Sequence, residues 1–167
     1  MDKKDKELLL KDLCARLPYG VIIDSKEYNE AAYRKHYLQR LITVKALSNK
    51  LTCIDIDDYP DPKIHTWEID LCKPYLRPMS SMTEEERIEF SKLLVKRYCE
   101  EDWEGHISTS YCIEIDNVYT DDENGIKYPS AFPMDAIDWL NAHHFDFRNL
   151  IERGLAIEVA KENNPYK

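Results

Sequence analysis

Hydrophobic residues follow two different spacings along the chain, and together these spacings predict an α+β fold. Leucines recur at helical spacing within residues 5–17, and Pro18-Tyr19-Gly20 ends that helix. A second helix is predicted from Thr83 to about Tyr98, because Thr83 stands three residues before Glu86 in the pattern of a capping box. A third predicted helix begins at Pro133 and ends near His143, followed by a short helical turn capped by Asp146.

Alternating and β-rich stretches between these helices predict strands. In residues 51–57, Ile54 and Ile56 alternate with Asp55 and Asp57, which indicates a half-buried strand with a wet acidic face. Residues 24–40 are ambiguous, and a helix over 27–40 with Tyr33 and Tyr37 on one face is one interpretation. The other predicted strands cover residues 21–23, 41–47, 64–71, 111–119 and 155–159.

These elements predict one compact domain over residues 1–167. Domains average roughly 150 residues, so a chain of 167 residues suits a single hydrophobic core. The expected architecture is α+β, with a small antiparallel sheet flanked by three helices. A sheet curled like an SH3 barrel is one form that such an arrangement could take.

Charge and cysteine content narrow the class of protein. The net charge is −9, and since nucleic-acid binding depends on Lys and Arg neutralising phosphates, this balance argues against nucleic acid as the partner. The five cysteines are an odd number without zinc spacing, which indicates reduced thiols. No stretch approaches the roughly 20 apolar residues of a membrane span. We therefore predict a cytoplasmic protein that does not bind a membrane.

The densest chemistry lies in residues 138–148, which contain His143, His144, two aspartates and an arginine. The histidines could form a metal site or a general base with Asp138 or Asp146. Adjacent helical residues point about 100° apart, however, so the pair cannot chelate one ion. We interpret the segment mainly as a packed helix C-terminus, and we predict no metal site and no cofactor.

Other charged clusters also favour ordinary surface roles. Arg77 belongs to a modest basic strip beside Tyr75 that could bind a partner, although neighbouring glutamates favour a solvated face with ion pairs. The acidic groups at 55–61 and 121–125 are interpreted as a solvated sheet face and a plain turn, because neither has the ligand pattern of a calcium loop. Candidate binding residues are His143, His144, Arg148, Tyr75 and Arg77.

Three segments together resemble a family of small uncharacterised proteins from gut anaerobes and their phages and mobile elements. They are residues 11–21 (KDLCARLPYGV), 73–86 (KPYLRPMSSMTEEE) and 138–148 (DWLNAHHFDFR). The resemblance implies an accessory role but no activity, substrate or catalytic residue. The chain departs from the pattern at Asn149, where glycine is frequent, and in a longer region over 25–63.

These observations give three functional hypotheses. The first is a phage or mobile-element accessory protein that acts by protein–protein interaction without catalysis, its partner and oligomeric state being open. The second is an acidic inhibitor of a host nucleic-acid-binding defence system, which rests on the charge of −9. The third is a metal-assisted enzyme that uses His143 or His144 with an aspartate.

Overall fold

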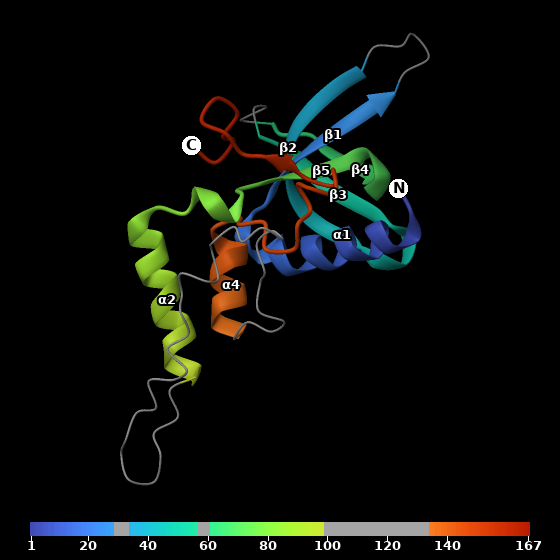
Figure 1. The fold of residues 1–167 in the computed structure, drawn as a ribbon. Helices are drawn as coiled ribbons and strands as arrows, with labels where there is room; N and C mark the ends of the chain where they lie inside the picture. Colours follow the sequence, from blue (N-terminus) through green and yellow to red (C-terminus); the bar gives the residue numbers. More distant parts are fainter. Residues whose placement is uncertain (29–33, 57–60, 99–133) are drawn as a thin grey trace, which may run out of the picture.

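The fold is built on one open sheet of six strands (Figure 1). The computed structural model describes residues 1–28, 34–56, 61–98 and 134–167. The strand order is β4-β3-β2-β1-β5-β6, and all neighbours are antiparallel except β5 and β6. The strands are β1 (Ile22–Tyr28), β2 (Arg34–Lys45), β3 (Lys50–Asp55), β4 (Ile64–Glu68), β5 (Cys72–Leu76) and β6 (Ile157–Glu158).

The predicted α+β class is confirmed, whereas an SH3-like barrel is not. In the described part of the chain, β4 and β6 form opposite edges of the sheet and do not pair with each other. Closing a barrel requires the first and last strands to meet in register. Here the last strand contains only two residues, so the sheet stays open.

Helices pack on one face and beside one end of the sheet. Helix α1 (Lys3–Arg16) crosses the face of the sheet, while α2 (Glu84–Tyr98) and α4 (Met134–Ala142) lie side by side next to it (Figure 1). Short 3-10 turns connect several of these elements, among them Leu17–Tyr19 between α1 and β1 and Ala46–Ser48 between β2 and β3. None of the helices in the described ranges is long and apolar enough to cross a membrane.

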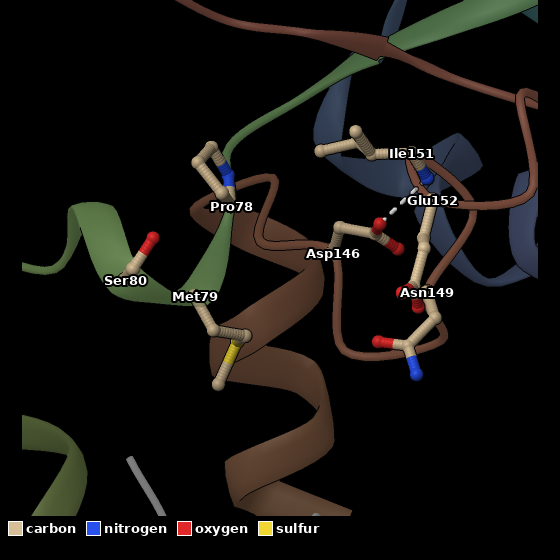
Figure 2. Close-up of a pocket in the computed structure, with 7 residues that line it drawn as sticks. All are labelled: Pro78, Met79, Ser80, Asp146, Asn149, Ile151 and Glu152. Carbon is tan, nitrogen blue, oxygen red and sulfur yellow. Dashed lines mark hydrogen bonds between the residues drawn. The ribbon is translucent and has the colours of Figure 1, made fainter. Parts of the chain in front are cut away.

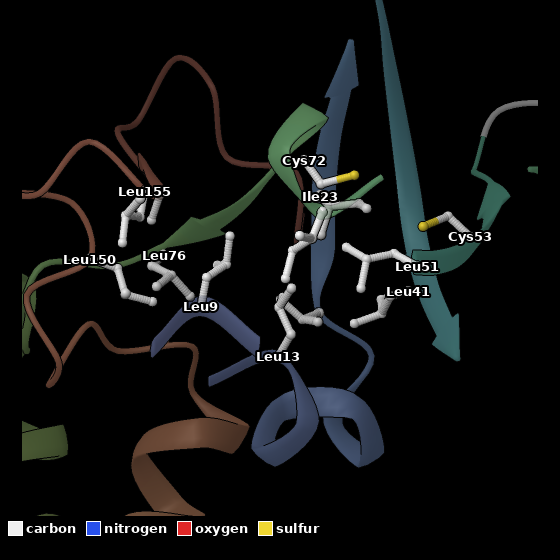
Figure 3. Close-up of a cluster of buried hydrophobic side chains, with 13 residues drawn as sticks. Leu9, Leu13, Ile23, Leu41, Leu51, Cys53, Cys72, Leu76, Leu150 and Leu155 are labelled. Carbon is white, nitrogen blue, oxygen red and sulfur yellow. The ribbon is translucent and has the colours of Figure 1, made fainter. Parts of the chain in front are cut away.

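The leucine stripe of α1 explains why this helix covers the sheet. Leu9 and Leu13 are fully buried and pack against Ile23, Leu41 and Leu51 from the strands (Figure 3). A second cluster lies between α2 and α4 and is formed by Met79, Met82, Phe90, Ala136, Leu140 and Phe145. Burying each large side chain stabilises the fold by about 1.5–3 kcal/mol.

The predicted boundaries of the helices are largely confirmed. The capping box at α2 is present, since Glu86 N donates to Thr83 Oγ1 at 3.2 Å and Thr83 N donates to Glu86 Oε2 at 2.9 Å. The stretch after Asp146 forms turns rather than the predicted helical turn. The predicted strand over 111–119 and turn over 121–125 lie outside the described residues.

The interpretation of residues 27–40 as a helix is wrong for the described part of that range. Residues up to Tyr28 continue β1, and β2 starts at Arg34. The two strands pair in register, with Ile23 opposite Gln39 and Ser25 opposite Tyr37. Cross-strand pairing of β2 with both neighbours outweighs the local helical tendency that the sequence suggested.

The prediction that the acidic face of the strand over 51–57 is exposed to solvent is also wrong for the described residues. The buried residues of β3 are Leu51 and Cys53, and Asp55 shares their face because side chains alternate along a strand. The Asp55 side chain is only 13% exposed. Ile54 points to the opposite face of the strand.

Candidate functional site

The segment richest in chemistry folds into a buried corner against α1 and β5. We call this the C-terminal corner, and it consists of Asp12, Arg16, Arg77, His144, Phe145, Asp146 and Arg148. At its centre, Arg16 Nε donates to Asp12 Oδ2 at 2.7 Å, and both side chains are fully buried. Arg148 Nη1 donates to the other Asp12 oxygen at 2.6 Å. Two arginines therefore share one buried carboxylate and join the N-terminal helix to the C-terminal segment.

His144 lies inside this corner, where its ring is buried and its Nδ1 has no hydrogen-bond partner among the described residues. Its backbone has a φ of 59°, and its carbonyl accepts a hydrogen bond from Arg77 N at 2.8 Å. Its ring stacks on Tyr166 with centroids 4.0 Å apart. Burial, together with the nearby charges of Arg16, His143 and Arg77, lowers the pKa of His144 to about 4. The imidazole is therefore neutral at physiological pH.

Asp146 terminates the corner by capping the following turn. Its two carboxylate oxygens accept hydrogen bonds from the backbone N–H groups of Leu150 and Ile151, at 2.9 and 2.8 Å. Burial raises the pKa of Asp146, although these two hydrogen bonds oppose the increase. The predicted capping role of Asp146 is thus present, around a turn instead of a helix.

His143 points away from His144 and occupies a separate environment. Its Nδ1 donates to the Trp139 carbonyl at 2.9 Å, and its ring stacks on the Trp139 indole at 3.9 Å between centroids. No group of three His, Cys, Asp or Glu side chains within the described ranges is placed to hold a metal ion. The structure therefore does not bring the two predicted histidines together around one ion.

Arg77 and Tyr75 also make structural contacts. Arg77 forms a bidentate ion pair with Glu86, both bonds being 2.7 Å, and its guanidinium stacks over Phe145 at 4.2 Å. The Tyr75 carbonyl accepts a hydrogen bond from the Tyr166 hydroxyl at 2.8 Å. Of the five predicted binding residues, His144, Arg148 and Arg77 thus meet in the C-terminal corner, and Tyr75 adjoins it through Tyr166.

A cavity of about 310 Å³ opens beside this corner (Figure 2). Asp146 faces it, but both of its oxygens already cap the turn. A ligand in this cavity would have to compete with those backbone donors for the carboxylate. The cavity is lined by Pro78, Met79, Ser80, Asp146, Asn149, Ile151 and Glu152.

A second group of polar and aromatic side chains lies on the sheet, on the face that α1 partly covers. We call it the polar-aromatic cluster, and it consists of Ser25, Tyr37, Gln39, Asp55, His65 and Trp67. Gln39 is fully buried at its centre, where its Oε1 accepts from Trp67 Nε1 at 2.6 Å and from Ser25 Oγ at 2.8 Å. Its Nε2 donates to Asp55 Oδ1 at 2.5 Å.

The aromatic members of this cluster meet above β3. Tyr37 from β2 contacts both β4 rings, with centroids 5.7 Å from His65 and 5.5 Å from Trp67. His65 Nε2 donates to Asp55 Oδ2 at 3.1 Å. The intervening β3 residue is Cys53, whose small side chain lets long side chains from β2 and β4 meet across it. Tyr37, Asp55, His65 and Trp67 are all half-buried, so the cluster reaches the surface.

The protonation states of Asp55 and Cys53 favour a binding role for the cluster over nucleophilic chemistry. Burial tends to raise the pKa of Asp55, but hydrogen bonds from Gln39 and His65 outweigh it and lower the pKa. Asp55 is therefore an anion at neutral pH. Burial, followed by the charge of Asp55, raises the pKa of Cys53 to about 12, so this thiol stays protonated.

The edge strand β4 presents its backbone beside the cluster. The β3–β4 ladder pairs Leu51 with Trp67 and Cys53 with His65. Asp55 N donates to the Lys63 carbonyl at 3.1 Å, and Ile69 N donates to the Asn49 carbonyl. These two bonds determine which residue pairs of the ladder are hydrogen-bonded, that is, the phase of the ladder. Because hydrogen-bonded and non-bonded pairs alternate in antiparallel sheets, the backbone groups of residues 64, 66 and 68 point away from β3.

Sequence reasoning missed this second site for one reason. The strand predicted over 64–71 is present as β4 from Ile64 to Glu68, with a 3-10 turn over Ile69–Leu71, but residues 34–40 are not predicted to be a strand. Without β2, Tyr37 and Gln39 have no position beside Asp55. Assigning the polar residues of 36–40 to a strand would have placed both on the face of Leu41. No protein-family model, curated protein or solved structure matches the chain.

Proposed function

We propose that the protein is a binding module that captures an extended segment of another protein along β4. The observation that carries this proposal is the open edge of the sheet: the backbone groups of Ile64, Thr66 and Glu68 point outward from the terminal strand of the described sheet. An extended chain can add to such an edge as another strand, with main-chain hydrogen bonds providing the affinity.

The side chains of β4 support this proposal. Natural proteins commonly protect edge strands with proline, lysine or a bulge. Within Ile64–Glu68 there is no proline, lysine or bulge, the charged Glu68 is paired with Lys50, and Ile64 is 64% exposed. On the opposite face of the strand, His65 and Trp67 present half-buried rings. A bound segment would therefore find an apolar contact on one face and an aromatic contact on the other.

The accessory role in a phage or mobile element, which the sequence resemblance implies, is the setting that we propose for this interaction. A non-catalytic role is part of the same proposal. The acidic-inhibitor hypothesis rests on the net charge of −9, which does not single out a surface. The metal-assisted enzyme has no support in the geometry of His143 and His144.

The experiment compares Thr66→Pro with Thr66→Ala. Proline at position 66 removes one outward N–H without breaking the β3–β4 ladder, whereas alanine removes only the side chain. Heptapeptides selected from a random displayed library against the wild-type protein are the probe, and fluorescence anisotropy measures their affinity. We expect Thr66→Ala to bind them like the wild type and Thr66→Pro to bind about tenfold more weakly.

Backbone NMR locates the peptide on the protein. Amide shifts should concentrate at Ile64, Thr66 and Glu68, which carry the outward groups. Equal affinity of the proline and alanine variants, or shifts confined to the cavity beside Asp146, would overturn the proposal. Circular dichroism of both variants verifies that the fold is intact before binding is compared.

A further inference from the structure

The polar-aromatic cluster indicates what kind of segment β4 would bind. Resting on the proposed function, we infer that the bound segment is basic and that it places an arginine or lysine side chain over Trp67 and Tyr37, directed toward the carboxylate of Asp55. The inference goes beyond edge pairing because backbone hydrogen bonds alone select no side chain.

The phase of the ladder determines which side chains of the bound segment meet the cluster. In an antiparallel addition, residues opposite Ile64, Thr66 and Glu68 are hydrogen-bonded pairs. Residues opposite His65 and Trp67 then occupy the non-bonded positions, where side chains of neighbouring strands approach most closely. Every second side chain of the segment therefore lies on the same face as the rings of His65, Trp67 and Tyr37.

Aromatic rings and an anion together favour a cation. The faces of Trp and Tyr attract an ammonium or guanidinium group through their quadrupole. Trp67 is held in place by its hydrogen bond to Gln39, so the binding of a cation would not require this ring to be ordered first. Behind the rings, Asp55 is an ionised carboxylate hydrogen-bonded to the Gln39 amide and to the ring of His65.

Distance selects a long side chain. Neighbouring strands are about 4.8 Å apart, so the backbone of an added strand lies roughly 10 Å from β3, across β4. A short side chain on the added strand would end over His65 and Trp67, whereas arginine and lysine are long enough to approach Asp55 beyond them. Arginine also offers a planar group that can stack on the rings, and because both Asp55 oxygens already accept hydrogen bonds from Gln39 and His65, this carboxylate attracts the cation through its charge.

On the opposite face of the strand, Ile64 favours an apolar residue opposite it, beside the exposed polar residues Thr66 and Glu68. Ile64 is 64% exposed, and its cross-strand neighbour Ile54 is half-buried on the same face. The expected recognition pattern is therefore an alternation of apolar residues with arginine or lysine.

The test uses two designed peptides that differ in charge alone. Both have the pattern Ser-Val-X-Val-X-Val-Ser with blocked ends, where X is arginine in the first and citrulline, its neutral near-isostere, in the second. Fluorescence anisotropy measures both against the wild type and against Asp55→Asn, which keeps the size and the acceptor oxygen. We expect the citrulline peptide to bind the wild type about tenfold more weakly, and we expect Asp55→Asn to remove most of that difference.

The outcomes separate this inference from the proposed function. Equal binding of both peptides to the wild type, with both weakened by Thr66→Pro, overturns the basic specificity and leaves edge binding standing. Basic specificity is also overturned, and edge binding again stands, if library peptides bind at β4 while the arginine peptide does not. Binding of the arginine peptide that Thr66→Pro and Asp55→Asn both leave unchanged overturns the two proposals together. A charge preference lost in Asp55→Asn and retained in Thr66→Ala supports the inference.

Discussion

The C-terminal corner and the polar-aromatic cluster contain the same types of side chain, but these side chains face in different directions. In the corner, Asp12, Arg16 and Asp146 turn inward and hold distant segments of the chain together. In the cluster, Gln39 is buried and binds Asp55 and Trp67, which are half-buried beside an edge strand. The sequence segment richest in reactive side chains therefore lies in the corner, where these side chains hold the fold together, whereas the surface that we propose for binding is formed by residues from several strands.

The largest effect should come from breaking the corner at Asp12. Removing this carboxylate in Asp12→Ala leaves the buried guanidinium of Arg16 without its ion-pair partner. Loss of one partner of a buried pair costs about 3–5 kcal/mol, measured as the free energy of unfolding in urea. Glu7→Ala is the control on the same helix, since the Lys3–Glu7 pair is exposed and should be worth less than about 1 kcal/mol. Equal losses in the two variants would contradict a structural role for the corner.

A smaller effect should appear as a pH dependence of stability that comes from the corner. The folded state lowers the pKa of His144 from 6.5 to about 4, so it favours the neutral ring. Its contribution is fully present above pH 6.5 and is lost as the pH falls toward 4, by about 3 kcal/mol in all.

His144→Asn tests this dependence, because asparagine tolerates the positive φ of 59° at this position and does not titrate. Urea unfolding between pH 7 and 4 should show a shallower loss of stability in this variant than in the wild type. Asp146, whose raised pKa favours folding at low pH, is present in both proteins and cancels in the comparison. An unchanged slope in His144→Asn would show that the ring is not held neutral.

The smallest effect concerns the hydrogen bond that holds Trp67 in place within the cluster. Trp67→Phe removes the hydrogen bond from Nε1 to Gln39 at 2.6 Å and should cost about 1 kcal/mol beyond the loss of ring area. Trp139→Phe is the same substitution at a buried indole nitrogen without a hydrogen-bond partner among the described residues, so it loses ring area and also removes an unpaired donor. The difference between their unfolding free energies combines the hydrogen bond at Trp67 with the relief of the unpaired donor at Trp139. A Trp67 variant no less stable than the Trp139 variant would show that Gln39 does not anchor the ring.

Much of the helical part of this protein could be predicted from local sequence. The leucine stripe of α1, the glycine after it and the Thr83–Glu86 capping box each depend on contacts within a few residues. The alternation at β4 and the capping role of Asp146 are local in the same sense. Such features follow from backbone geometry that the neighbouring residues themselves impose.

Only the tertiary structure decided which carboxylates are buried and which side chains share a surface. The local sequence indicates only that Asp12 lies on a helix. Its hydrogen bond from Arg148, which is far away in the chain, exists only in the tertiary structure. Residues 34–40 became part of β2 through pairing with β1 and β3, and that pairing brought Gln39 beside Asp55. Strand partners and the Asp12–Arg148 ion pair are long-range contacts, whose energies depend on packing and dielectric surroundings that no local pattern encodes.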